Sequence, residues 1–274
     1  MNKLKEIFKR DKNIIIGVIH FPPLLGYKDF PGFNIALKNA LKDLDAFKKG
    51  GVDGIIFENN YDIPHKVFVD PEIVASMTFL IQEILKRKSI KMPFGISVLW
   101  NDYKAALSIA KICRADFVRI SVFVDSVKTQ YGKIFAEPKK VLSFGKRIKA
   151  QKIALFTDIH VKHAKMIEKK TITQSAKEAK KKGADCIIIT GKWTGNAPDI
   201  SKLKEARKAV GKNFPILVGS GANKNNIKSL LQYANGIIVS TSLKRGAPKR
   251  GEVNIKSYNQ RIDEKKVKNL IKQL

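Results

Sequence analysis

The feature that most constrains this chain is a regular alternation of short β-prone runs with longer amphipathic stretches. From residue 13 onward, runs rich in Ile, Val and Phe are typical of buried strands. They are Ile14–Ile19, Gly54–Phe57, Phe94–Leu99, Phe117–Val122, Ile153–Thr157, Cys186–Thr190, Ile216–Val218 and Ile237–Ser240. Each run precedes a stretch with helical periodicity, over 34–49, 71–88, 102–113, 137–149, 172–182, 199–210, 224–233 and 262–273. Such alternation predicts a parallel sheet with right-handed crossovers.

Eight strand–helix units within 274 residues predict one α/β domain over 1–274, a (β/α)₈ or TIM barrel. An open doubly wound sheet is the alternative, but the first strand–helix junction lacks the Gly-x-Gly-x-x-Gly dinucleotide fingerprint. We expect residues 1–12 to form a short helix that covers the bottom of the barrel. Its Leu4, Ile7 and Phe8 share one face among basic residues, so contact with an anionic membrane surface is the other interpretation.

The connections between these elements are asymmetric. Links from a helix to the next strand are brief, whereas links from a strand to the next helix are long. The long links are 20–33, 59–70, 123–136, 160–171, 191–198 and 241–261, the last including an excursion over 245–261. Because barrel enzymes carry their active sites at the C-terminal ends of the strands, we expect the functional site on this face.

Polar residues stand at the end of every predicted strand. They are His20, Glu58, Asn59, Asn101, Asp102, Arg119, Ser121, Asp158, His160, Thr190, Ser220, Thr241 and Ser242. Their convergence predicts a polar pocket at the barrel mouth. For single residues a structural role is an open alternative, since Asp102 could cap a helix and Glu58 could form an ion pair with Arg119 inside the barrel.

The stretch Asp158-Ile-His160-Val-Lys162-His163 carries the predicted acid/base chemistry. Side chains alternate along a strand, so Asp158 and His160 are expected to emerge on the same side, and Lys162 joins them if the extended geometry persists. A carboxylate can orient an imidazole and raise its basicity near neutral pH. His163 falls off the alternation and is expected to support the loop or contact substrate from above. Otherwise Asp158 merely caps a turn.

The loops after the last two strands favour an anion. Gly219-Ser220-Gly221 follows one strand and Thr241-Ser242 the other, while Thr190-Gly191 ends the strand before them. Glycines let backbone N–H groups approach a phosphate, which barrels often hold at this position. Tight turns without a ligand are the alternative explanation of the glycines.

The net charge of +29 is the unusual part of the composition. Its lysines are spread over nearly every predicted helix, and no arginine-rich, aromatic-interleaved groove accompanies them, so no specific nucleic acid is expected. Cys113 and Cys186 form no metal-spaced pair, which favours a reduced, cytoplasmic setting. No signal peptide and no membrane-spanning run is recognised.

Several blocks of the sequence resemble the BtpA family, which includes the SgcQ-like proteins. They are His20-Phe-Pro-Pro-Leu-Leu-Gly26, Gly51-Val-Asp-Gly-Ile-Ile-Phe-Glu-Asn59, Leu99-Trp-Asn-Asp102, Asp158-Ile-His-Val-Lys-His-Ala164, Thr190-Gly191 with Thr194-Gly195, and Gly219-Ser-Gly221 with Thr241-Ser-Leu-Lys244. The resemblance is collinear over 13–245 and implies a (β/α)₈ barrel. The founding member is linked to photosystem I accumulation as a membrane-associated factor, and other members look like enzymes of carbohydrate or nucleoside metabolism.

These observations predict an enzyme acting on a small phosphorylated metabolite, a sugar phosphate or nucleoside-derived compound. Asp158, His160, Glu58 and Lys162 are the predicted catalytic residues. The predicted substrate and phosphate ligands are His20, Asn101, Arg119, Thr190, Gly191, Gly219, Ser220, Gly221, Thr241 and Ser242. Hydrolysis or phosphorolysis of a glycosidic bond, isomerisation and aldol cleavage all fit, and Lys162 as a Schiff-base nucleophile is a variant.

No cofactor is expected. The variant with a divalent metal would use ligands from His20, Glu58, Asp158, His160 and His163. A non-catalytic, peripherally membrane-associated factor for the biogenesis of membrane complexes is the alternative function. Peripheral contact with an anionic membrane and homo-oligomerisation stay open as partners.

Overall fold

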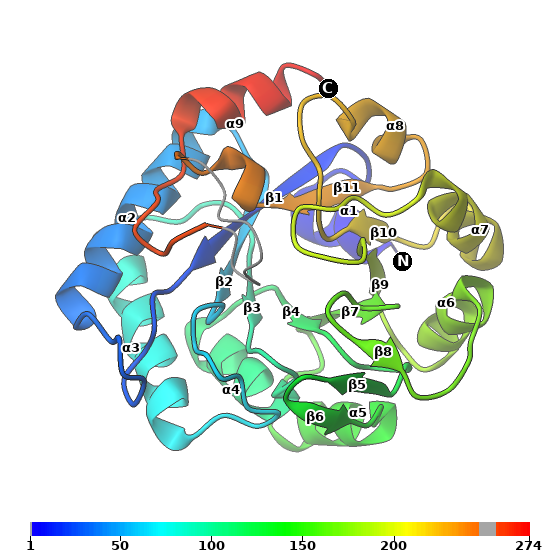
Figure 1. The fold of residues 1–274 in the computed structure, drawn as a ribbon, viewed down its shortest axis with the longest axis horizontal. Coiled ribbons are helices and arrows are strands. Elements are labelled where there is room, and N and C mark those ends of the chain that lie inside the picture. The colour runs from blue at the N-terminus through cyan, green and yellow to red at the C-terminus, as the bar shows by residue number, and fades with distance from the viewer. Residues whose placement is uncertain (1, 247–255) are drawn as a thin grey trace.

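The computed structural model describes residues 2–246 and 256–274, and its centre is a closed barrel of parallel strands surrounded by helices (Figure 1). The strands are β1 Ile14–His20, β2 Gly54–Glu58, β3 Phe94–Ser97, β4 Phe117–Ile120, β7 Ala154–Ile159, β9 Cys186–Ile189, β10 Ile216–Val218 and β11 Gly236–Val239. Neighbours pair in the order β1-β11-β10-β9-β7-β4-β3-β2, and β1 also pairs with β2, which closes the ring. The predicted (β/α)₈ barrel is confirmed.

The outer layer is formed by helices that follow the strands in turn. They are α2 Phe33–Gly50, α3 Pro71–Arg87, α4 Tyr103–Cys113, α5 Pro138–Arg147, α6 Ile172–Lys181, α7 Ile200–Val210, α8 Ile227–Leu231 and α9 Glu264–Ile271. Local capping fixes several starts: Asp102 accepts a hydrogen bond from the Ala105 N–H, and Thr171 forms a capping box with Gln174. Of the excursion expected over 245–261, residues 247–255 lie outside the described part.

The interior of the barrel changes character along its axis. Near the N-terminal ends it is apolar, with the rings of Phe117 and Phe156 stacked at 4.4 Å between centroids. Two residues further along the same strands, the inward-facing positions carry Arg119 and Asp158. The two-residue period of a strand therefore places a charged layer directly above an apolar plug.

The N-terminal helix α1 (Lys3–Phe8) closes the bottom of the barrel, as the sequence predicts. Leu4 and Phe8 are buried in the same cluster as the barrel interior, and the Phe8 ring lies 6.0 Å from that of Phe117. The apolar face of this helix is therefore covered by the protein itself and is not free to enter a membrane.

Removing the Phe8 ring should destabilise the fold. We expect Phe8→Ala to lower the free energy of unfolding by about 3 kcal/mol, because a buried aromatic side chain leaves a cavity when it is truncated. Urea denaturation measures this, with the exposed Lys5→Ala on the same helix as control. Equal stability of the two variants would contradict the packing described for α1.

Two of the long links fold into a structure that the sequence did not predict. Segments expected as loops, 123–136 and 160–171, pair with each other in a small sheet with the order β6-β5-β8. Its strands are β5 Val127–Thr129, β6 Gly132–Ile134 and β8 Lys165–Met166. This sheet lies beside β4 and β7 at the barrel mouth, where it forms a wall of the site (Figure 1).

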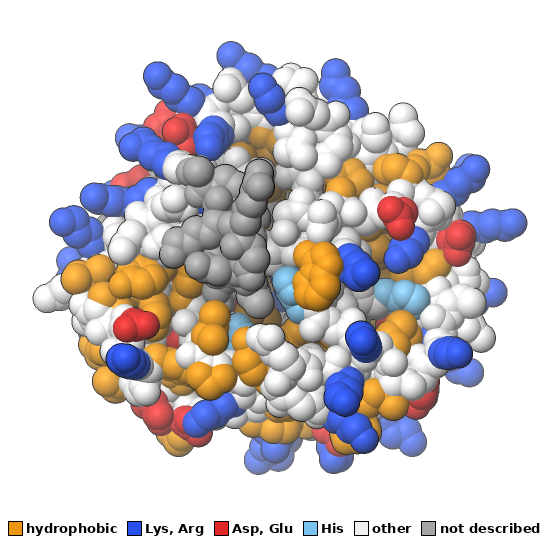
Figure 2. All heavy atoms as spheres, in the orientation of Figure 1, with side chains coloured by type: hydrophobic (Ala, Val, Ile, Leu, Met, Phe, Trp, Pro, Cys, Tyr) orange, Lys and Arg blue, Asp and Glu red, His pale blue; other side chains and the backbone are white. Residues whose placement is uncertain are grey.

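The excess positive charge is distributed rather than concentrated. Figure 2 shows Lys and Arg side chains over much of the outer part of one face, with hydrophobic and His side chains nearer its centre. Within the described ranges, no helix is both long and apolar enough to cross a bilayer.

Candidate active site

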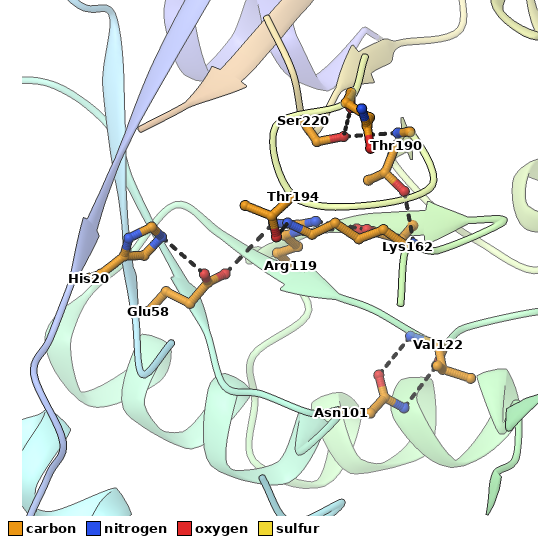
Figure 3. Close-up of polar contacts among 12 residues, drawn as sticks. His20, Glu58, Asn101, Arg119, Val122, Lys162, Thr190, Thr194 and Ser220 are labelled. Carbon is orange, nitrogen blue, oxygen red and sulfur yellow. Dashed lines mark hydrogen bonds and ion pairs between the residues drawn. The ribbon is translucent and has the colours of Figure 1, made fainter. Parts of the chain in front are cut away.

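Two adjoining cavities open at the C-terminal ends of the strands. The first, of about 400 Å³, lies by the ends of β1, β10 and β11, and the second, of about 450 Å³, lies against the β5–β6 hairpin. The residues that line both are Glu58, Asn60, Arg119, Lys162 and Thr194. A charged group drawn from β2, β4 and the link after β7 therefore stands where the cavities meet (Figure 3).

Glu58 ends β2 and is held by its neighbours on both sides. His20 Nε2 lies 3.3 Å from Glu58 Oε1, and Arg119 Nη1 lies 3.7 Å from Glu58 Oε2. Burial raises the pKa of Glu58, but the hydrogen bond from His20 and the nearby cations Arg119 and Lys162 outweigh it and hold this pKa well below its usual range. Burial lowers the pKa of His20 to about 4, so its imidazole is neutral at neutral pH. Glu58 Oε2 is buried without a hydrogen-bond partner among the described residues, so it can accept a hydrogen bond from a ligand.

Arg119 and Asp158 form a bidentate ion pair inside the barrel. Arg119 Nε donates to Asp158 Oδ1 at 2.9 Å and Arg119 Nη2 donates to Asp158 Oδ2 at 2.8 Å. The Asp158 side chain is completely buried and lines neither cavity, whereas Arg119 lines both. Asp158 therefore fixes the guanidinium that faces the site and does not itself face a substrate.

Lys162 reaches the centre of the site from the link after β7. Its backbone N–H donates to Thr190 Oγ1 at 2.9 Å, and its Nζ lies 3.4 Å from Thr194 Oγ1. Burial lowers the pKa of its ammonium to about 8, with the Arg119 guanidinium adding to the shift. Lys162 therefore lines the mouth although the extended geometry that the prediction required ends at Ile159, and its proton is exchangeable near neutral pH.

The predicted pairing of Asp158 with His160 is wrong. Strand β7 ends at Ile159, and His160 has a positive φ of 48°, so the alternation stops one residue too early to bring the imidazole inward. The His160 N–H donates to Asp125 Oδ2 at 3.0 Å, and its ring lines neither cavity. Burial lowers the pKa of His160, the charge of Asp125 opposes this shift and that of Lys202 adds to it.

The ligand set of the metal variant does not assemble either. Asp158 is fully engaged by Arg119, and His160 is turned outward. In residues 2–246 and 256–274, no group of three or more His, Cys, Asp or Glu side chains is placed to hold a metal ion.

The two glycines after β10 allow close packing against neighbouring segments. The Gly219 N–H donates to the Ile189 carbonyl at 2.9 Å. It is therefore not available to bind a phosphate, contrary to the prediction. A Cβ at Gly219 would lie 2.6 Å from Ile188 Cγ2 and 3.5 Å from Arg119 Nη2, which explains the glycine. Gly221 lies against the backbone of 196–197 in the same way, where a Cβ would approach the Ala197 nitrogen to 2.0 Å.

Several hydroxyl and amide ligands predicted from the sequence are committed to the protein. Ser220 Oγ accepts from the Gly191 N–H and donates to the Asn196 carbonyl, both at 2.8 Å. Asn101 bonds both backbone groups of Val122, apart from the charged centre (Figure 3). Thr190, Gly191 and Asn101 line neither cavity, whereas Thr241 and Ser242 line the first.

Lys244 is the main site residue that the sequence reasoning missed. It is 1% exposed, lines the first cavity, and its Nζ donates to Tyr61 Oη at 2.9 Å. Burial lowers the pKa of Lys244 to about 8. Ser240 Oγ, buried beside it in the same cavity, has no hydrogen-bond partner within the described residues. The only sequence signal for Lys244 was its position at the end of the Thr241-Ser-Leu-Lys244 block. A single lysine does not stand out in a chain that contains so many lysines.

The second cavity has ring-bearing walls that were also not predicted. His65, Trp100 and Tyr131 line it together with His163 and Trp193. His163 Nε2 lies 2.8 Å from Thr194 Oγ1, so this histidine supports the link after β9, which is one of the two roles expected for it.

Two solved structures show the same architecture at low sequence identity. (S)-3-O-geranylgeranylglyceryl phosphate synthase from Thermoplasma acidophilum matches with a TM-score of 0.60 and 14% identity, covering 99% of this chain and 96% of that one. Phosphoribosyl anthranilate isomerase from Thermus thermophilus matches with a TM-score of 0.57 and 9% identity, over 95% and 98% of the two chains. These similarities establish the fold.

Relatives at higher identity extend over most of the chain. The photosystem I biogenesis protein BtpA of Synechocystis is 36% identical over 236 residues, which is 85% of this chain and 81% of the relative. A mitochondrial protein of Caenorhabditis elegans is 32% identical over 258 residues, 92% of either chain. The model of the BtpA family matches residues 11–274, a wider span than the resemblance seen in the sequence blocks. The chain belongs to the BtpA family.

Proposed function

We propose that this protein is an enzyme that acts on a small phosphorylated metabolite by acid/base chemistry at the mouth of the barrel. The observation that carries the proposal is the pair formed by Glu58 and Lys162. Both side chains are buried, both line the two cavities, and their pKa values lie on either side of neutral pH. The pKa of Lys162 is lowered to about 8, and a buried group whose pKa lies close to neutral pH is typical of groups that exchange protons with a substrate.

The charges of Glu58 and Lys162 at neutral pH assign them different catalytic roles. Glu58 is ionised at neutral pH and has one unpartnered oxygen among the described residues, so it serves as the general base. Lys162 is protonated but close to its pKa, so it serves as the general acid. Arg119, held by Asp158, adds a fixed positive charge that stabilises negative charge developing on the substrate.

The first cavity is where the phosphate would bind. Lys244, Lys256 and Lys266 line it, and ammonium groups bind phosphate as point charges. Among proteins of the same fold, the Thermoplasma synthase was solved with sn-glycerol-1-phosphate as substrate. Hydrolysis or phosphorolysis of a glycosidic bond, isomerisation and aldol cleavage are the reaction classes that fit these residues.

A metabolite panel tests this function. Sugar phosphates and nucleoside monophosphates are incubated with the protein and followed by ¹H and ³¹P NMR, with the Glu58→Gln variant in parallel. We expect at least one compound to be converted by the wild type and spared by Glu58→Gln. A full panel with no conversion, or conversion equal in the two proteins, would overturn the proposal.

The dependence of turnover on pH follows from the lowered pKa of Lys162. The general acid must be protonated, so kcat/KM should fall as pH rises through about 8, below the usual range of a lysine. Lys162→Arg should move this fall to higher pH, because a guanidinium stays protonated. A rate that keeps rising up to about pH 10 would instead indicate that Lys162 acts unprotonated, as in Schiff-base chemistry. Trapping with borohydride and substrate would then label Lys162.

A second candidate is favoured by the similarity to the Synechocystis photosystem I biogenesis protein. In that case the chain would be a non-catalytic factor for membrane complexes, docking through its basic surface. It predicts flotation with anionic vesicles that decreases with salt and is unchanged in Lys162→Met. Absence of flotation at low salt would dismiss it.

A further inference from the structure

The walls of the second cavity are built from rings that come from five separate links, His163 being in the link after β7. His65 precedes α3, Trp100 follows β3, Tyr131 lies in the β5–β6 turn, and Trp193 follows β9. The rings of His65 and Tyr131 pack edge to face at 5.4 Å, and those of His163 and Trp193 lie 5.3 Å apart. Rings of this kind bind flat ligands by stacking.

Three polar atoms of these rings lack a hydrogen-bond partner among the described residues. His65 Nδ1, His163 Nδ1 and Tyr131 Oη are buried and make no hydrogen bond with the part of the chain that is described. His65 itself is only 7% exposed. Buried polar groups are normally paired, so these atoms suit a ligand with hydrogen-bonding groups on its edge.

The second cavity differs from the first in its rings rather than in its charge, because Glu58 and five cationic side chains line each of them. Burial lowers the pKa of His65 and of His163 to about 4, so both imidazoles are neutral at neutral pH. Lys128, Lys165 and Lys192 also line this cavity, but they are exposed residues. The ring-bearing part of its wall is therefore neutral and suits a planar ring of a ligand.

From these contacts we infer that the second cavity binds an aromatic or heteroaromatic ring of the substrate. The substrate class is then a phosphorylated sugar joined to a planar ring, as in a nucleoside monophosphate, with its phosphate in the first cavity. This inference rests on the proposed function. Because Glu58, Arg119 and Lys162 line both cavities, the part of the substrate between phosphate and ring lies beside the acid/base pair.

Tryptophan fluorescence provides a direct test, because the chain has two tryptophans and both line this cavity. Four nucleoside monophosphates, AMP, GMP, CMP and UMP, are titrated with excitation near 295 nm, and ribose 5-phosphate and inorganic phosphate serve as ring-free probes. At least one nucleotide should quench the emission and bind roughly 10- to 100-fold more tightly than ribose 5-phosphate, the range expected for stacking of one base. The ring-free probes should bind without quenching.

Variants locate the ring. His65→Ala and Trp193→Ala should each reduce the advantage of the nucleotide over ribose 5-phosphate, while the affinity for ribose 5-phosphate, measured by calorimetry, stays unchanged. Trp193 is 53% exposed, so its replacement should not disturb folding. Nucleotides that bind no more tightly than ribose 5-phosphate, or an advantage that survives both variants, would overturn the inference.

The two proposals fail in distinguishable ways. Suppose that ribose 5-phosphate binds and that Lys244→Met abolishes this binding, but no nucleotide binds more tightly than ribose 5-phosphate. The ring site is then wrong and the phosphate site stands. Suppose instead that a nucleotide quenches the tryptophan emission and that His65→Ala weakens its binding, but no phosphorylated compound is converted. The ring site then stands and the enzymatic function is wrong.

Discussion

Replacement of Lys162 by Met is expected to lower kcat/KM by about 10²- to 10⁴-fold, the usual contribution of a general acid. The Lys162 side chain is buried at the junction of the cavities. Methionine has a similar volume but no ammonium group that could donate a proton. Stability should not fall, because a buried cation that repels Arg119 is removed. Steady-state kinetics on the compound found in the metabolite panel measures the effect.

Lys152→Met is the matched control for this variant. Lys152 is exposed and precedes β7 at the opposite end of the barrel, so its loss removes the same charge without touching the site. Turnover of the control should match the wild type. If Lys162→Met retains wild-type kcat/KM while folding normally, Lys162 has no role in the reaction.

Replacement of Asp158 by Ala is expected to reduce the free energy of unfolding by about 3–5 kcal/mol. Asp158 is the completely buried partner of Arg119, and its removal leaves a guanidinium inside the barrel with Glu58, 3.7 Å away, as its remaining ion-pair partner among the described residues. Arg119 would also lose its fixed position, so activity should fall together with stability. Urea denaturation followed by fluorescence measures the loss.

The surface pair Lys88–Asp45 supplies the control for this variant. Lys88 Nζ lies 3.1 Å from Asp45 Oδ2, and both side chains are 41% exposed. Asp45→Ala should change the free energy of unfolding by less than about 1 kcal/mol, since exposed ion pairs contribute little. A similarly small change in Asp158→Ala would contradict the structural role of the pair.

The fold was predictable because its signals are local and repeated. Every barrel strand is a short apolar run, and each is followed by an amphipathic helix, so an error in one unit leaves the others in place. The three-stranded sheet at the mouth was not predictable in this way. Its pairing joins Val127 with Met166, which are far apart in a stretch of sequence that carries little hydrophobic periodicity.

The site was predictable only where the strand geometry continues. Glu58 and Arg119 lie within regular strands, and the structure brings them together as an ion pair near the mouth, which was one of the two interpretations of these residues. His160 was misplaced because a positive φ directly after β7 turns its side chain outward, which no periodicity reveals. Lys244 was missed because its burial depends on packing against Tyr61, far away in the sequence.

A crystal structure of the Glu58→Gln variant with the phosphorylated compound from the panel would show directly whether one substrate spans the two cavities. We expect the phosphate in the first cavity, within hydrogen-bonding distance of Lys244 Nζ. We expect the reacting atoms to lie at the junction of the two cavities, beside Lys162 and the glutamine that replaces Glu58. A ligand bound elsewhere on the barrel, or one whose reacting atoms lie away from Lys162, would contradict the proposed acid/base site.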